Sequence, residues 1–169
     1  MLDGKISYSL SEELCVVKMV GRVQYFASLD LGVFVKSMAD TPFQECVIDL
    51  TEATYLDSTS LGVIAGLKSL EQEKPNYIGT TIYSTDSSIN DILYGVGLQT
   101  IFEIKNENPK HGTELLPIVS TNELEDEDTR DIFLGAHKEL STINEENRST
   151  FSNVIELLEG ESKGNLATV

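Results

Sequence analysis

The chain has 169 residues, 40% of them hydrophobic and 24% charged, and its 28 acidic and 12 basic side chains give a formal net charge of −16. This balance argues against nucleic acid or an anionic membrane as a partner, because both bind clustered Lys and Arg, and it favours a basic protein surface. The longest apolar runs are only a few residues, and the N-terminus lacks the apolar segment of a signal peptide. We therefore expect a cytoplasmic protein.

The first part of the chain predicts two strands and a helix. Residues 5–10 and 15–20 have strand character and pair across a turn at Ser11-Glu12-Glu13. Apolar residues then recur at i, i+3, i+4 and i+7, the spacing of one helix face: Leu31, Phe34, Val35 and Met38. The helix ends at Asp40-Thr41-Pro42.

A short apolar strand follows, and its end is the most informative stretch of the chain. Residues 46–50 suit a strand covered on both faces, and residues 51–54 are interpreted as a polar connection. Asp57-Ser58-Thr59-Ser60-Leu61-Gly62 then leads into a helix that ends at Lys74-Pro75-Asn76. Ser58 therefore lies at or next to the first helical residue, where free N–H groups favour an added phosphate.

The remaining front part continues the alternation. Residues 77–83 predict a strand, residues 87–94 a short helix, and residues 101–104 and 115–118 further strands. Alternating strands and helices predict an α/β sheet with crossover helices.

Two landmarks resemble the STAS family, the domain of anti-sigma-factor antagonists and of sulphate-transporter tails. The first is the order of strand, polar connection, Asp57 to Gly62 and helix; the second is Ile92-Leu93 followed by Gly97-Leu98 and Ile101-Phe102. The resemblance covers residues 1–118 and implies a STAS-like mixed β-sheet with packed helices.

The antagonist branch implies a phospho-switch. In that branch the Ser directly after Asp is phosphorylated, which here is Ser58, with Thr59 and Ser60 as alternative acceptors. The implied partners are a GHKL-type serine kinase acting as an anti-sigma factor and a metal-dependent serine phosphatase. The protein itself would need no cofactor, only its kinase's ATP. Asp57 can cap its helix, contact the partner, or do both.

One departure from the family pattern concerns charge. Many antagonists carry Gly-Glu-Leu-Asp after the second strand, whereas this chain has Gly21-Arg22-Val23-Gln24. Arg22 could pair with a phosphate on Ser58, or the kinase could bind a different surface. Arg22 and Gln24 are both expected among the partner-binding residues. Gly62 and Gly66 lie four residues apart, where each costs about 1 kcal/mol relative to Ala. They indicate either helix-on-sheet packing or a partner's backbone docked beside Ser58.

Residues 119–169 form a more acidic extension. Ser120-Thr121-Asn122-Glu123 can cap a helix, and acidic residues 125–128 suit its first turn. Apolar residues then alternate in steps of three and four, interrupted by Asn147 and Thr150, and predict one long helix: Phe133, Ala136, Leu140, Ile143, Val154 and Leu157. This helix would pack on the front domain, pair with another copy, or bind a partner. Residues 160–169 are predicted to be disordered.

The cysteines and histidines do not form a pattern typical of a metal site or a catalytic site. Cys15 and Cys46 lie in strand-like runs without a CxxC spacing, which predicts buried reduced thiols. His111 and His137 have no partner pattern, so neither a metal site nor catalysis is expected. An adaptor that binds through its C-terminal helix remains an alternative to the switch. An enzyme using Asp57 and Ser58 would need a general base that the nearby sequence does not supply.

Overall fold

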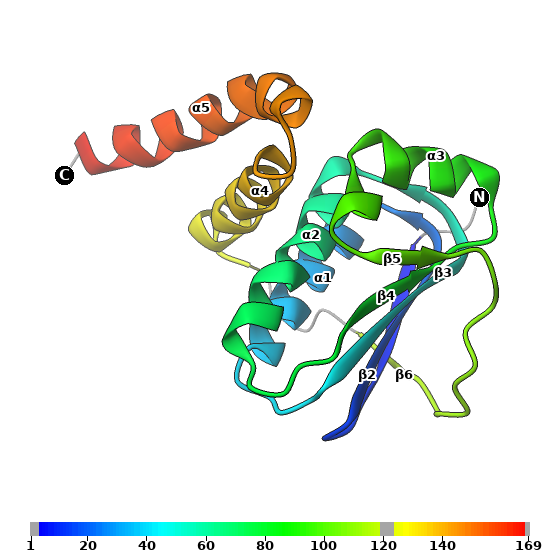
Figure 1. Cartoon of the computed structure of the whole chain (residues 1–169). Helices are drawn as coiled ribbons and strands as arrows, with labels where there is room; N and C mark the ends of the chain where they lie inside the picture. Colours follow the sequence, from blue (N-terminus) through cyan, green and yellow to red (C-terminus); the bar gives the residue numbers. More distant parts are fainter. Residues whose placement is uncertain (1–3, 119–123, 168–169) are drawn as a thin grey trace.

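The computed structural model describes residues 4–118 and 124–167, with side chains up to residue 160. A six-stranded mixed sheet has the order β5-β4-β3-β2-β1-β6 (Figure 1). β1 runs antiparallel to β2 and β6, while β2, β3, β4 and β5 are parallel neighbours. The strands are β1 (Lys5–Leu10), β2 (Leu14–Val23), β3 (Glu45–Leu56), β4 (Gly79–Tyr83), β5 (Glu103–Lys105) and β6 (Leu116–Pro117). The predicted α/β sheet is confirmed.

Helices α1 (Phe26–Met38) and α2 (Ser58–Glu73) lie side by side along the sheet, and α3 (Ser87–Gly95) with the short 3-10 turn η1 (Leu98–Thr100) packs at the β5 end (Figure 1). The apolar face predicted for the first helix is seen in α1, where Leu31 and Met38 are both 1% exposed. Each parallel crossover thus covers the sheet with one apolar helix face.

β3 is longer than the sequence predicts. Residues 51–54, interpreted as a polar connection, continue the strand, because Glu52 and Ala53 still pair with β2. The burial there alternates, with Ala53 and Leu56 buried and Glu52 and Thr54 exposed. One face of this segment is covered and the other is open, so polar residues alternate with apolar ones instead of ending the strand. The additional residues of β3 place Asp57 directly before the first residue of α2.

The C-terminal extension forms two helices where the sequence predicts one. α4 (Asp126–Ser141) packs on α2, and α5 (Glu145–Ala167) turns back against α4 and then extends away from the body (Figure 1). Ile132, Ala136 and Leu140 of α4 belong to the same buried core as α1 and α2. Packing of the extension on its own domain is therefore confirmed for α4. α5 continues past Gly160, and the proposed cap at residues 120–123 lies outside the described residues.

Asparagine side chains explain the break between α4 and α5. Asn144 Oδ1 accepts the Asn147 N–H at 2.8 Å and so caps α5. Asn147 is 3% exposed. Its Nδ2 donates to the carbonyls of Leu140 and Val96, each at 2.9 Å. The three-and-four spacing continues through this turn even though Asn147 and Thr150 are polar, which is why spacing alone predicts a single helix.

The two cysteines are free and buried, as predicted. The Cys15 thiol lies 3.3 Å from Met38 Sδ. A hydrogen bond with Cys15, followed in size by burial, raises the pKa of Cys46 well above its usual value. Both thiols are therefore core groups, and that of Cys46 stays protonated at neutral pH.

The substitution Asn147→Ala is expected to lower the free energy of unfolding by about 1–3 kcal/mol, because it removes two hydrogen bonds from a buried turn. Asn153→Ala, on an exposed position of the same helix, is the matched control and is expected to change it by less than about 0.5 kcal/mol. Urea unfolding followed by circular dichroism measures both. Equal values for the two variants would contradict the role given to Asn147.

Candidate functional site

Asp57 organises the point where β3 passes into α2. Its backbone is extended, and its Oδ1 accepts the Ser60 N–H at 2.8 Å, which caps α2. The same carboxylate accepts the Ser28 hydroxyl at 2.7 Å and, through Oδ2, the Tyr25 N–H at 3.0 Å. The cap role predicted for Asp57 is confirmed. The additional bonds fix the start of α1 against the start of α2.

Ser58 is the first residue of α2, and its hydroxyl faces the extension. Ser58 Oγ lies 2.9 Å from Nε2 of His137 in α4, a residue 79 positions away. His137 Nδ1 lies 2.7 Å from the carbonyl oxygen of Phe133. A carbonyl only accepts, so Nδ1 carries the proton, and in the neutral ring Nε2 accepts the Ser58 O–H. The cap of α2 is Asp57 and not Ser58, so the Ser58 hydroxyl is not used for capping.

The other two hydroxyls of the motif are enclosed. Thr59 is 4% exposed and Ser60 is fully buried. Ser60 Oγ donates to the backbone oxygen of Asp57 at 2.8 Å. Ser58 is only partly buried, so of these three it is the hydroxyl that a modifying enzyme reaches with the least rearrangement.

The glycines of α2 face α4. A Cβ placed on Gly62 would lie 2.1 Å from the Ala136 carbonyl oxygen, and one on Gly66 would lie 3.6 Å from Glu139 Cγ. Helix-on-sheet packing is therefore not the reason for these glycines. The second interpretation expected a partner's backbone here, but the backbone that lies against Gly62 belongs to α4 of the same chain. On α1, a Cβ at Gly32 would lie 2.6 Å from Ile132 Cγ2.

Arg22 and Gln24 lie at the end of β2 and in the turn after it. The Arg22 guanidinium lies 4.4 Å from the centre of the Tyr55 ring, and its Nη2 donates to Gln24 Oε1 at 3.4 Å. Next to them, Tyr25 has a φ of 51° and is 70% exposed, and Phe26 is 81% exposed. The Tyr25 N–H is bonded to Asp57, so these two large exposed side chains lie next to the predicted site. Neither was predicted from the sequence as a site residue.

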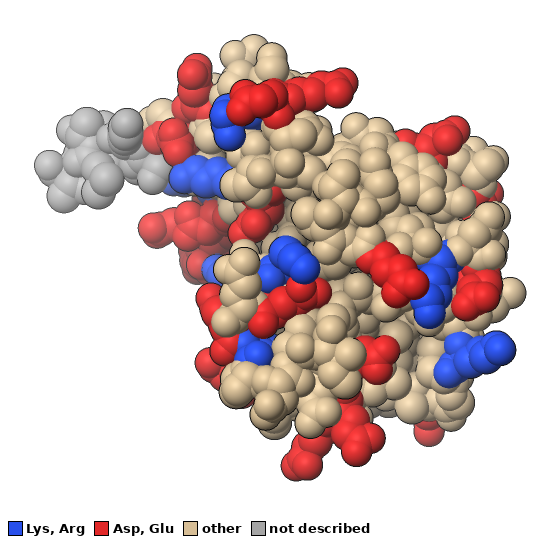
Figure 2. Space-filling view, in the orientation of Figure 1, with Lys and Arg blue, Asp and Glu red and all other residues tan. Residues whose placement is uncertain are grey.

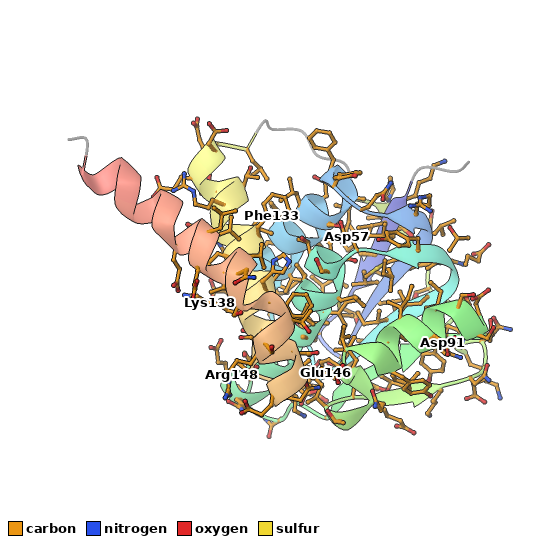
Figure 3. All side chains as sticks on the ribbon, turned by 90° about the horizontal axis from the view of Figure 1, so that it is seen from above. Asp57, Asp91, Phe133, Lys138, Glu146 and Arg148 are labelled. Atoms are coloured by element: carbon orange, nitrogen blue, oxygen red, sulfur yellow. The ribbon has the colours of Figure 1, made fainter. Side chains whose placement is uncertain are left out.

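His137 is the main residue that sequence reasoning missed. It is 7% exposed and packs edge-on against Phe151 of α5, with ring centres 5.6 Å apart. In the view from above, the labelled Phe133 of α4 and Asp57 lie near each other (Figure 3). His137 directly follows Ala136 in sequence and so lies beside the apolar seam of α4. Only the packing of α4 on α2 brings His137 to Ser58.

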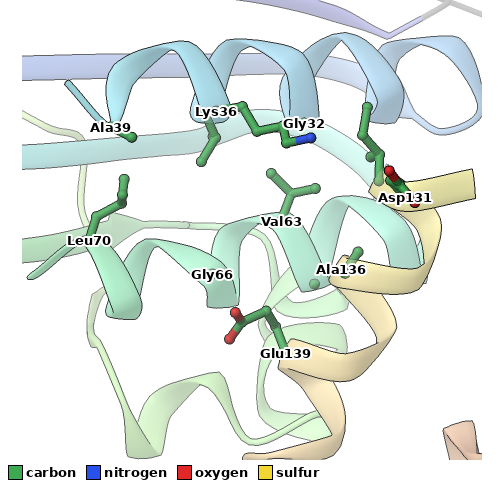
Figure 4. A pocket seen from close by; sticks show the side chains of 13 residues that line it. Gly32, Lys36, Ala39, Val63, Gly66, Leu70, Asp131, Ala136 and Glu139 are labelled. Carbon is green, nitrogen blue, oxygen red and sulfur yellow. The ribbon is translucent and has the colours of Figure 1, made fainter. Parts of the chain in front are cut away.

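A cavity of about 460 Å³ lies between α1, α2 and α4, with mostly apolar walls. Figure 4 shows Lys36 of α1, Val63 and Gly66 of α2, and Glu139 of α4 around it. Neither Ser58 nor His137 lines this cavity. Within residues 4–118 and 124–160, no group of three or more His, Cys, Asp or Glu side chains has the geometry of a metal site.

The mixed sheet and its helices are the STAS fold. A crystal structure of an anti-sigma factor antagonist from Mycobacterium paratuberculosis matches 60% of this chain and 85% of its own, with a TM-score of 0.50 and 18% sequence identity. No family model matches the sequence.

Two curated relatives are similar in sequence. Anti-sigma-B factor antagonists from Listeria monocytogenes and Listeria innocua are each 40% identical to this chain over 60 residues, which is 35% of this chain and 50% of each relative. The chain thus spans half the length of the curated relatives that it matches. Together, the fold and these relatives support a STAS protein of the anti-sigma-factor-antagonist type.

Gly62→Ala is expected to displace α4, because the added methyl group would overlap the Ala136 carbonyl. Hydrogen exchange of the amides in residues 126–141 should then become faster. Gly66→Ala is the control on the same helix, since its methyl group meets Glu139 at an ordinary distance. Equal exchange of α4 in both variants would show that the contact at Gly62 does not hold the helix.

Proposed function

We propose that this chain is a phospho-switch of the anti-sigma-factor-antagonist type. Its unphosphorylated form binds a GHKL-type serine kinase that acts as an anti-sigma factor, and phosphorylation of Ser58 weakens that binding. The observation that carries the proposal is a partly buried Ser58 hydroxyl at the first residue of α2, directly after the capping Asp57. The STAS fold and the relatives named anti-sigma-B factor antagonists support it.

The proposed mechanism is electrostatic. A phosphate on Ser58 adds about −1.5 to −2 charges at neutral pH. It would lie beside the Asp57 carboxylate, which already accepts hydrogen bonds from Ser60, Ser28 and Tyr25. Repulsion and desolvation at such a contact can exceed about 3 kcal/mol, which is more than a hundredfold in affinity. A contact shaped for a neutral hydroxyl is thereby lost.

The partner surface in this proposal includes Asp57, Ser58, Thr59, Gly62, Gly66, Arg22 and Gln24. Tyr25 and Phe26 extend it, because they are exposed and adjacent to Asp57. On the face that Figure 2 shows, acidic side chains are more widespread than basic ones. With a formal net charge of −16, a basic partner surface fits best. Arg22 either pairs with the phosphate or contacts the partner.

A metal-dependent serine phosphatase would reset the switch, and the protein would act without a cofactor of its own in the cytoplasm. None of the helices in the described part of the chain is both long and apolar enough to cross a membrane.

An adaptor function has one observation in its favour. Leu157, on the part of α5 that extends away from the body, is 63% exposed. A partner bound there would not contact Ser58. Deleting the extension cannot separate the two functions, because Ile132 and Leu140 belong to the core. Leu157→Glu does so instead: an adaptor loses its partner, whereas a switch centred on Ser58 retains it.

The Ser58–His137 pair also supplies the general base that an enzyme would need. The geometry argues against hydrolysis, however. The His137 ring is buried, and the cavity between α1, α2 and α4 is lined by neither Ser58 nor His137, so this cavity does not hold a substrate against the pair. The Nδ1 partner is a backbone carbonyl and not a carboxylate, so a protonated ring would lack the stabilisation that a triad gives.

Partner capture from cells of the native host tests the switch, using the wild-type protein, Ser58→Ala and Ser58→Asp side by side. We expect a serine kinase to be retained by the wild type and by Ser58→Ala, and to be reduced about a hundredfold with Ser58→Asp. Mass spectrometry identifies the kinase and also detects phosphate on Ser58 in the wild type. Retention of the same partners by all three proteins would contradict the proposal.

A further inference from the structure

We infer that α4 and the serine kinase compete for one surface, the face of α1 and α2 around Ser58. In this inference, which rests on the proposed function, the extension is an internal competitor of the kinase. A phosphate on Ser58 and a docked α4 also exclude each other. The three helices meet at Gly32, Gly62 and Ser58.

The first argument is the state of the Ser58 hydroxyl. Its oxygen lies 2.9 Å from His137 Nε2 and donates its proton to that nitrogen. In the side-chain conformation seen here, a phosphoryl group on this oxygen would overlap the imidazole. His137 is held in turn by the Phe133 carbonyl and by the Phe151 ring. We therefore expect a phosphate on Ser58 to displace α4.

The second argument is steric access. A kinase must bring the γ-phosphate of ATP to Ser58 Oγ and so must contact the first turn of α2. One turn further along α2, the α4 backbone lies against Gly62, close enough that no Cβ fits between the two. Ala136 is 4% and Ile132 is 7% exposed in this contact. The surface that the kinase needs is thus already covered.

The third argument is that the cover is incomplete. The cavity between α1, α2 and α4 leaves part of the α4 interface without packing partners. Lys36, Asp131 and Glu139 lie at this cavity together with apolar residues (Figure 4). This space is open to solvent, so α4 buries less apolar surface along it than a fully covered helix would, and the contact contributes less to stability. An interface of this kind favours reversible release of α4 over permanent attachment.

The turn between α4 and α5 provides a second attachment. Asn147 donates to the Val96 carbonyl, and Asn144 and Ile143 pack against Gly97. This contact joins the turn to the end of α3 and does not involve Ser58 itself. An α4 that leaves the Ser58 surface can stay tethered through this turn, which keeps the competitor close to its site.

The chain contains a matched control for the effect of a phosphate. Asp86 caps α3 by accepting the N–H groups of Ser88 and Ile89, and Ser87 is the first residue of that helix. The arrangement repeats that of Asp57 and Ser58. Ser87 is exposed, and its helix packs mainly on β3 and η1. A phosphate at Ser87 reproduces the local helix-start chemistry without the α4 contact.

The decisive experiment installs phosphoserine during translation at position 58 or at position 87 of the full chain and follows hydrogen exchange by mass spectrometry. With phosphoserine at position 58, the amides of α4 should exchange at least about tenfold faster than in the wild type, with β3 unchanged. With phosphoserine at position 87, α4 should exchange as in the wild type. Unchanged or slower exchange of α4 in the first protein would overturn the inference, as would equal acceleration in both.

A second measurement tests the competition with the kinase. In Gly66→Cys/Glu139→Cys, the new thiols face each other, because Glu139 Cγ lies 3.6 Å from the Cβ position at residue 66. The oxidised protein holds α4 in place, and the reduced form of the same protein is its control. ATP and an extract of host cells supply the kinase, and intact mass reports phosphate on Ser58. Phosphorylation should be at least about tenfold slower in the oxidised form; equal rates would overturn the inference.

Failure of the proposed function gives a different pattern. If the extract never phosphorylates Ser58, even in the reduced or wild-type protein, the proposed kinase is contradicted. The hydrogen-exchange comparison does not need that kinase, so its result on the exclusion between phosphate and α4 stands by itself.

Discussion

The distance between α2 and α4 is the constraint on which the site depends. Gly62 lets the backbone of α4 approach the first turns of α2, and a single methyl group at that position would overlap Ala136. Because the helices are this close, the imidazole of His137 reaches Ser58 directly. Asp57 acts from the other side, where it ties the start of α1 to the cap of α2. The environment of one hydroxyl is thus set by three helices that are distant in sequence.

Local features of the sequence predicted local structure well. The apolar spacing in residues 31–38, the Asp57 to Gly62 motif and the strand character of residues 5–10 all correspond to elements of the fold. These signals depend on periodicity and on helix-start chemistry, which act over a few residues. The two errors arose where tertiary packing decides the outcome. Half-covered residues 51–54 remain in β3, and buried Asn147 ends a pattern that otherwise continues.

Only those residues of the candidate site that belong to one short sequence motif were predictable. Asp57 and Ser58 follow from the motif, and Asn144 before two acidic residues was a cap signal that could have located the start of α5. His137 gave no such signal, since its role requires contact with a residue 79 positions earlier. Gly62 and Gly66 indicated a close approach, but not that the approaching backbone belongs to the same chain.

The cavity beside Gly66 affects how such a chain can diverge. If α4 must leave before a partner binds, the apparent affinity of that partner is the intrinsic one reduced by the fraction of molecules in which α4 is already released. Larger side chains at the cavity wall would fill it and shrink that fraction, and smaller ones would enlarge it. Residues that touch neither the phosphate nor the partner can thereby set the concentration at which the pathway responds. The response threshold can change while the recognition surface stays the same.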